Sequence, residues 1–63
     1  MSLGARIKRR REELWLTQAE LGETIGVSRQ HVSFWERDVV TPSLENIKRL
    51  AKALQCDLAS LIG

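Results

Sequence analysis

Apolar residues recur along almost the whole chain at the three- and four-residue spacing of helices. Leu3, Ile7 and Leu14 fall on one such stripe, which position 10 or 11 completes with an arginine. The alternating pattern of a strand is nearly absent, because Val39 and Val40 are too short a run to form one. The pattern therefore predicts an all-α protein, and its first helix carries an arginine on the apolar face.

Capping signals mark the ends of the second and third helices. Thr17 and Glu20 form a Thr-x-x-Glu capping box, which opens a helix. Gly26 is the natural end of that helix, since glycine takes the left-handed conformation without strain. Ser28 is a favourable N-cap for a third helix directly afterwards.

Two further helices are predicted after a polar, irregular stretch from residue 37 to 42. Ser43 caps a strongly amphipathic helix, and Asp57 caps a short final one. Their apolar positions are Leu44, Ile47, Leu50, Ala51 and Leu54, then Leu58, Leu61 and Ile62. Without a linker, repeat or low-complexity stretch, the five helices predict a single compact domain over residues 1–63.

The second and third helices are separated by only three residues in QAELGETIGVSRQHVSFWE, residues 18–36. So short a turn forces a steep crossing, which needs a small residue where the two backbones approach, and Gly22 stands at that place. The inward positions are then Leu21, Ile25, Val27, Val32 and Trp35. This arrangement is the pattern of a helix-turn-helix.

Composition limits what can stabilise so small a fold. One cysteine, Cys56, and one histidine are too few for an internal disulfide or a four-ligand zinc site. The packing of the helices therefore has to stabilise the fold. We expect Cys56 to be a partly buried apolar residue without activation, and we expect no catalytic site, cofactor or metal. No apolar run approaches the ~20 residues that cross a bilayer, and we expect a cytoplasmic protein.

The net charge of the chain says little about its binding partners, but the distribution of the charges along the chain says more. The net charge is only +2, but half of the ten cations lie within six positions. These five are Arg6, Lys8, Arg9, Arg10 and Arg11. A run of this kind is either a solvated helix face or a set of contacts to an anionic partner.

The outward residues of the third helix suit the reading of base edges. A helix fits the major groove of DNA, and its N-terminal residues come closest to the bases. Arg29 can bond bidentately to guanine O6 and N7, and Gln30 to adenine N6 and N7. Phe34 can contact a thymine methyl, and Ser33 lies on the same face. We therefore predict base contacts from these four residues.

Residues around the two helix starts are candidates for phosphate contacts. The free amides of a helix N-terminus attract anions, which favours Thr17, Gln18 and Ser28. Capping by Thr17 and Ser28 is compatible with that role. His31, in the first turn of the third helix, is either a surface histidine or a phosphate or sugar contact. Arg37 follows the helix and is predicted to contact the phosphate backbone of DNA.

These motifs together resemble the phage repressor and Cro family of helix-turn-helix proteins, often called xenobiotic-response-element-like. The resemblance rests on RIKRRREEL, LTQAELGETIGVSRQHVSFWER and PSLENIKRLAKAL, and it covers Arg6 to Ile62. It implies a compact five-helix, lambda-repressor-like domain of a transcriptional regulator, usually a repressor, that binds a palindromic double-stranded operator as a homodimer.

The resemblance also implies roles for individual side chains. Gln18 corresponds to the residue that clamps the phosphate backbone and can brace a side chain of the third helix. Arg11 corresponds to an arginine that pairs with a glutamate ending that helix, here Glu36, with Arg10 as the competing candidate. Arg6, Lys8, Arg9 and Arg10 would then meet solvent or nonspecific phosphates.

The chain departs from the family pattern at two helix ends. Trp15 stands where the family has Gly, Asn or Lys, because the first helix ends there in a left-handed residue. A tryptophan in that conformation is strained by ~1–2 kcal/mol unless the turn is remodelled. Gln55 likewise replaces the usual Gly or Asn at the end of the fourth helix.

The loop after the third helix carries Val39 and Val40 where the family has cations. With Leu61 and Ile62 these valines are either a dimer interface or residues packed beneath the loop. A second function of a different class also stays open. The same fold can serve as a protein-interaction module, such as the partner-binding part of an antitoxin, with Trp15, Val39 and Val40 as its contact surface.

Overall fold

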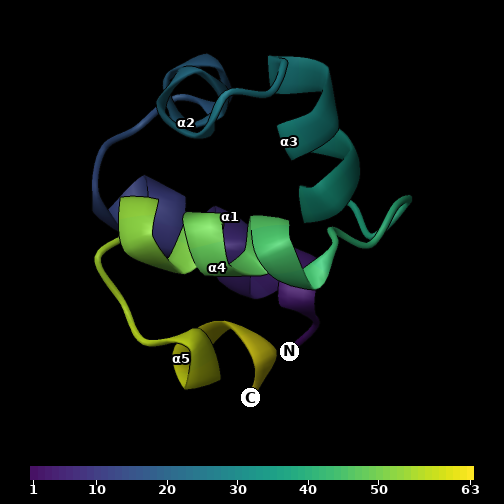
Figure 1. Cartoon of the computed structure of the whole chain (residues 1–63), viewed down its shortest axis with the longest axis vertical. Coiled ribbons are helices and arrows are strands. Elements are labelled where there is room, and N and C mark those ends of the chain that lie inside the picture. The colour runs from purple at the N-terminus through teal and green to yellow at the C-terminus, as the bar shows by residue number, and fades with distance from the viewer.

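Five helices and no strand make up the fold in the computed structural model, which describes residues 1–63 (Figure 1). They are α1 (Leu3–Glu13), α2 (Gln18–Ile25), α3 (Arg29–Glu36), α4 (Leu44–Ala53) and α5 (Leu58–Ile62). The all-α prediction is confirmed. None of these helices is long and apolar enough to span a membrane.

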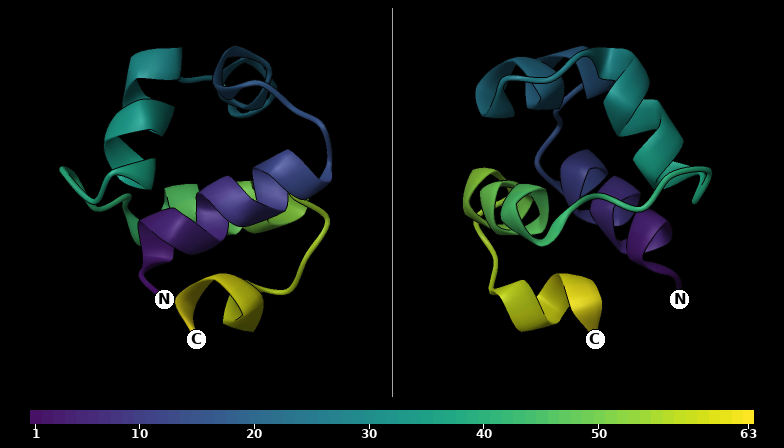
Figure 2. Two further views of the ribbon diagram at one scale, coloured as in Figure 1. Left: turned by 180° about the vertical axis from the view of Figure 1, so that it is seen from behind. Right: turned by 45° about the vertical axis from the view of Figure 1, so that its right-hand side comes forward.

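The helices surround one core. α1 and α4 cross the middle of the molecule, with α2 and α3 at one end and α5 at the other (Figures 1 and 2). The buried apolar residues come from all five helices and the end of α4: Ile7, Leu21, Ile25, Val32, Trp35, Ile47, Leu50, Ala51, Leu54 and Leu61. Trp35 is only 3% exposed and is a core residue. The ends of α2 and α3 are thereby held on a rigid base.

The start and end of α2 are those that the sequence predicts. The Thr17 hydroxyl accepts a hydrogen bond from the Glu20 amide at 3.0 Å, and the Glu20 carboxylate accepts one from the Thr17 amide at 2.8 Å. Both halves of the capping box are therefore present. Gly26 ends the helix with φ of 83°, in the left-handed region where glycine carries no steric penalty.

The other helix starts follow the prediction with one exception. Ser28 and Ser43 each accept a hydrogen bond from the third amide of their helix. Ser2 caps α1 in the same way, although the sequence analysis did not identify it. Asp57 is the N-cap residue of α5, as predicted, but its side chain makes no capping hydrogen bond.

Two glycines allow helices to approach closely. A Cβ at Gly22 would lie 2.7 Å from the carbonyl oxygen of Val27, which explains why the crossing of α2 and α3 needs a residue without a side chain. A Cβ at Gly4 would overlap the carbonyl oxygens of Trp35 and Glu36. α1 therefore contacts the end of α3 backbone to backbone, a contact that the hydrophobic pattern did not predict.

The burial of two leucines differs from the prediction. Leu44, predicted to be in the core, is 59% exposed, because a helix buries only the part of its stripe that neighbouring helices reach and Leu44 is the first residue of α4. Leu61 is 1% exposed and belongs to the core cluster. It is not available to a second subunit, so its assignment to a dimer interface was wrong.

Three residues other than glycine adopt a left-handed backbone, each near a helix end: Trp15 (φ 60°), Asp38 (φ 59°) and Gln55 (φ 54°). Trp15 and Gln55 are the positions where the chain departs from the family pattern. At Trp15 the turn keeps the left-handed residue and accommodates the tryptophan in it, with the side chain 91% exposed. The protein therefore holds local strain at this point.

Replacing Trp15 by glycine should stabilise the fold. Glycine relieves a left-handed strain of ~1–2 kcal/mol but adds flexibility to the unfolded chain, so we expect a net gain of about 1 kcal/mol. For a domain of this size the gain corresponds to a rise in Tm of roughly 4–8 °C, measurable by circular dichroism. Trp15→Ala is the matched control, because alanine also lacks the indole but keeps the Cβ. An equal rise in both variants would show that strain is not the cause.

Candidate nucleic-acid interface

A buried ion pair joins α1 to the end of α3. Arg11 Nε and Nη2 donate hydrogen bonds to the two carboxylate oxygens of Glu36, at 2.6 and 3.0 Å, and both residues are buried. Arg11 Nη1 also donates to the Leu16 carbonyl at 2.7 Å. The hydrogen bond to Glu36 raises the pKa of Arg11 against the opposing effect of its burial, so the guanidinium stays charged. Arg11, and not Arg10, is thus the arginine on the apolar stripe that pairs with Glu36.

Gln18 attaches the start of α2 to the same carboxylate. Its Nε2 donates to Glu36 Oε1 at 3.0 Å. A carboxylate only accepts hydrogen bonds when ionised, so the NH₂ group must face Glu36 and the amide oxygen must face away. Gln18 therefore braces a residue of α3, and the network holds the start of α2 at a set distance from the end of α3.

The predicted base-reading residues lie beside Gln18. Arg29, Gln30 and Ser33 of α3 line a shallow, wholly polar hollow together with Gln18. Arg29 and Gln30 are exposed, Ser33 is half-buried, and none of the three side chains makes a hydrogen bond within the domain. Their donors and acceptors are free for a ligand.

Both helix starts carry backbone amides without a hydrogen-bond partner in the domain. At α2 the Thr17 hydroxyl takes the Glu20 amide, which leaves the amides of Gln18 and Ala19 without an acceptor. At α3 those of Arg29 and Gln30 are likewise unpaired. Unpaired amides at a helix N-terminus favour an anion. Three of the residues that carry these amides, Gln18, Arg29 and Gln30, also line the polar hollow.

Phe34 and Arg37 form one unit at the end of α3. The Arg37 guanidinium carbon lies 5.3 Å from the centre of the Phe34 ring, within cation–π range. Phe34 is half-buried, so part of its ring stays accessible. Arg37 is exposed and has no carboxylate partner. Its positive charge is therefore uncompensated within the domain, which suits a contact to phosphate.

His31 and Ser28 are linked to each other. The Ser28 hydroxyl oxygen lies 2.8 Å from His31 Nδ1 and accepts a hydrogen bond from the His31 amide. The imidazole ring meets the Trp35 ring edge-on, with the centroids 6.3 Å apart. His31 is exposed, and its second ring nitrogen, Nε2, makes no hydrogen bond in the domain. The pair thus rigidifies the start of α3.

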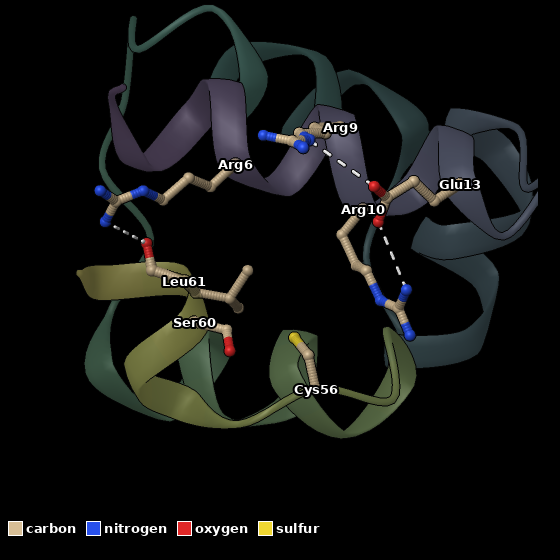
Figure 3. A pocket seen from close by; sticks show the side chains of 7 residues that line it. All are labelled: Arg6, Arg9, Arg10, Glu13, Cys56, Ser60 and Leu61. Atoms are coloured by element: carbon tan, nitrogen blue, oxygen red, sulfur yellow. Dashed lines mark hydrogen bonds and ion pairs between the residues drawn. The ribbon is translucent and has the colours of Figure 1, made fainter.

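Arg6, Lys8, Arg9 and Arg10 of α1 were expected to meet either solvent or nonspecific phosphates. Arg6, Arg9 and Arg10 line a hollow between α1 and the α5 region, with Glu13 and Cys56 also in its wall (Figure 3). α5 lies at the end of the molecule away from α2 and α3 (Figure 2), so the hollow between α1 and α5 is on that side. Arg6, Arg9 and Arg10 therefore lie on the side of α1 that faces α5, away from the helix-turn-helix.

Two of these arginines complete helix C-termini instead. Arg10 Nε donates to the Leu54 carbonyl at 2.8 Å and Nη2 donates to that of Gln55 at 3.3 Å. Arg6 Nη1 donates to the Leu61 carbonyl at 3.4 Å (Figure 3). Cations are favourable where helix carbonyls have no intrahelical partner. Arg10 therefore secures α4 to α1.

Cys56 lies in the wall of this hollow and is half-buried. Burial raises the pKa of its thiol, with the Arg10 charge acting in the opposite direction. The thiol is thus held in its protonated, weakly nucleophilic form.

The two valines of the loop between α3 and α4 are exposed. Val39 is 61% and Val40 47% exposed, so the interpretation that they pack beneath the loop was wrong. The loop itself is fixed, because the Asp38 carboxylate accepts hydrogen bonds from the Ser2 hydroxyl at 2.7 Å and the Gly4 amide at 3.0 Å. The valines are therefore presented to solvent on a held loop.

Trp15 and the valines do not share a surface. The connection from α1 to α2 and the connection from α3 to α4 lie at opposite ends of the molecule in Figures 1 and 2. A single contact surface made of Trp15, Val39 and Val40, as the antitoxin-like alternative requires, is therefore absent from this fold.

The helix-turn-helix family matches residues 7–61, which is nearly the whole chain. The chain belongs to this family. Two of the curated relatives of this helix-turn-helix chain are repressors of phages. The Repressor protein C2 of Salmonella phage P22 is 48% identical over 54 residues, covering 86% of the chain and 25% of the relative. The Immunity repressor protein of Bacillus phage phi105 is 38% identical over 63 residues, covering 100% of the chain and 44% of the relative.

The fold of this helix-turn-helix chain matches a repressor structure solved with DNA. The crystal structure of the P22 c2 repressor in complex with a synthetic operator superposes with a TM-score of 0.93, at 44% identity, over 98% of this chain and 94% of that one. The chain spans a quarter to less than half of the length of the two curated relatives. The phage-repressor type of the domain follows from these similarities.

Several contacts that orient this helix-turn-helix had no signal in the sequence. The Asp38 carboxylate, which holds the loop after α3, and Gly4, which lets α1 approach it, are distant in the chain. The capping of α4 by Arg10 spans 44 residues. The one indication in the sequence is that cations outnumber acids in α1, so some of these cations have to find partners outside that helix.

Proposed function

We propose that the 63 residues form one DNA-binding domain of a transcriptional repressor, which reads double-stranded DNA by laying α3 in the major groove. The base contacts would come from Arg29, Gln30, Ser33 and Phe34. The phosphate contacts would come from Thr17, Gln18, Ser28, His31 and Arg37. The family membership and the likeness to an operator-bound repressor support this function.

One observation carries the proposal. Glu36, at the end of α3, is bonded both to Arg11 of α1 and to Gln18 at the start of α2. This buried network sets the free amides of α2 beside the unpaired polar side chains of α3. A duplex that places its bases against α3 would then bring a phosphate to α2. Phosphate contacts fix the register in which base contacts are read.

We further propose that the domain acts as a homodimer on a palindromic operator. Two copies would place their α3 helices in successive major grooves, ~34 Å apart on one face of the duplex. The exposed apolar side chains of Val39, Val40 and Ile62 are the proposed interface. Few cations face the DNA in one copy, so the second copy would supply much of the affinity through an increased effective concentration.

Such a function is binding without chemistry. We propose that the domain acts without catalysis, cofactor or metal, as a base-reading surface needs only hydrogen bonds, apolar contacts and charge. A DNA reader of this kind works where the DNA lies, which we propose to be the bacterial nucleoid or the cytoplasm of a phage-infected host.

The experiment that tests the proposal is selection of bound duplexes from a random pool. We expect one enriched sequence with two-fold symmetry and half-sites about 10–10.5 base pairs apart from centre to centre. An enriched sequence without symmetry would contradict the dimer but keep DNA reading. Failure to enrich any sequence, with affinity indifferent to salt, would contradict the function and favour a protein-interaction module.

Arg37→Ala should weaken binding to every duplex by a similar factor. Loss of one phosphate contact should reduce the slope of log affinity against log salt by about 1 for each copy bound, because one fewer counterion is released. Fluorescence anisotropy at several salt concentrations measures the slope. Arg9→Ala is the matched control, since Arg9 lines the hollow beside α5, and its slope should equal that of the wild type. A slope unchanged in Arg37→Ala would remove Arg37 from the interface.

A further inference from the structure

Trp15 is an unpartnered aromatic side chain held in a strained backbone. It is 91% exposed, its φ is 60°, and its indole Nε1–H takes part in no hydrogen bond of the domain. We propose that Trp15 contacts the sugar–phosphate backbone of DNA and extends the phosphate-binding surface of α2 beyond its first turn. The inference rests on the proposed function, and it adds a DNA contact that the phosphate candidates named above do not include.

The position of Trp15 in the chain puts it within reach of the same DNA strand as the start of α2. Only Leu16 and Thr17 separate it from Gln18, so the two Cα atoms are at most ~11 Å apart. One strand of a duplex presents a phosphate for about every 3.4 Å along its axis. A strand that meets the free amides of Gln18 and Ala19 therefore carries further phosphates within range of the indole.

The segment that carries Trp15 is held next to the start of α2. Its neighbour Leu16 accepts a hydrogen bond from Arg11 through its carbonyl, so the segment leading into α2 is anchored to the Arg11–Glu36 pair. The connection from α3 to α4, which carries the exposed valines that we assign to a second copy, lies on the opposite side of the molecule from the connection between α1 and α2 (Figure 2). Trp15 thus belongs with Gln18 and the network, and not with the proposed dimer surface.

The chemistry of an indole suits this contact. Its N–H is a donor without acceptor capacity, which fits a phosphate oxygen, and its apolar body can cover a deoxyribose. The group carries no charge, so its contact releases no counterion. It therefore adds affinity without adding to the salt dependence, unlike the arginine at position 37.

The affinity test compares Trp15→Gly with the wild type on the selected duplex and on an unrelated duplex of equal length. We expect both affinities to fall about tenfold per copy bound, the effect of one hydrogen bond to a charged group, with an unchanged salt slope and unchanged base preference. Trp15→Phe keeps an apolar ring without the N–H and should lie between the two proteins. The expected gain in stability of Trp15→Gly means that a loss of affinity would not reflect unfolding.

The fluorescence test follows the indole itself. Trp35 is 3% exposed, so acrylamide quenching of the free protein reports mainly on Trp15. Saturation with either duplex should protect that emission, and Trp15→Gly should show little quenching in either state. Quenching that is unchanged by saturating DNA would overturn the inference, as would wild-type affinity of Trp15→Gly for both duplexes.

The two tests separate this inference from the function on which it rests. If the wild type binds the selected duplex tightly while Trp15→Gly is unaffected, the role of Trp15 is wrong and the reading of DNA by α3 stands. If Trp15→Gly instead loses self-association measured by sedimentation, Trp15 is a protein contact and the inference is overturned. If the wild type binds no duplex, both proposals fail.

Discussion

Arg11→Met is expected to lower the free energy of unfolding by about 3–5 kcal/mol, the effect of leaving one partner of a buried ion pair without the other. The Glu36 side chain is 2% exposed and would keep only the hydrogen bond from Gln18. The Leu16 carbonyl would also lose its donor. A domain of this size has a total stability on the order of 3–9 kcal/mol, so the variant should be close to unfolding.

Urea denaturation at low temperature measures this loss, with Arg9→Met as the matched control. Arg9 is an arginine of the same helix, 68% exposed, whose ion pair with Glu13 spans 3.6 Å. A surface pair of this kind contributes ~0–1 kcal/mol, so the control should unfold almost like the wild type. Equal losses in the two variants would contradict a structural role for the buried pair.

A double variant separates the pair from the packing around it. Arg11→Met with Glu36→Leu removes both charges and leaves two apolar side chains in the space they filled. Replacing a whole buried pair by apolar residues is often nearly neutral, so we expect the double variant to regain much of the stability. It should nevertheless bind DNA less well than the wild type, because Gln18 would lose the acceptor that positions it.

Gln30→Ala is expected to reduce affinity for the selected operator by about 1–3 kcal/mol per half-site and to relax the preference at one base-pair position in each half-site. Gln30 is exposed in the first turn of α3, and its side chain makes no hydrogen bond in the domain. Alanine is a good helix former, so the fold should be unaffected. The loss would then be that of a bidentate contact to one base.

The measurement is a set of affinities for the operator and its single-base variants. Gln55→Ala is the matched control, since Gln55 is an exposed glutamine at the end of α4. It should leave the base preference unchanged. An affinity of Gln30→Ala that falls by the same factor on all duplexes would mark Gln30 as a backbone contact and leave the base reading to Arg29 and Ser33.

Much of the helix-turn-helix could be predicted because its signals are local. The Thr17 capping box, the left-handed Gly26 and the Ser28 cap each depend on residues within one turn of each other. The need for a small residue at Gly22 follows from the short turn beside it. The order of elements and the exposed face of α3 could therefore be inferred without knowing how the helices pack.

The surroundings of the helix-turn-helix could not be predicted in the same way. Periodicity alone left residues 10 and 11 equivalent on the stripe of α1, and the choice of Arg11 came from the family pattern. In the structure Arg11 faces Glu36 and Arg10 faces the end of α4, because α3 and α4 approach α1 from different sides. Neighbouring residues on a helix point about 100° apart, and this difference in direction decides which partner each arginine meets.

The sequence by itself determined where α2 begins and ends and where α3 and α4 begin, which residues are polar on the face of α3, and that packing had to stabilise the domain. Only the tertiary structure decided which apolar residues are covered, as in the buried Leu61 and the exposed Leu44 and Val39. It also turned three arginines of α1 away from the interface (Figure 3). The reason is physical: caps and turns depend on neighbours in the chain, whereas burial and ion pairing depend on which distant surface a helix meets.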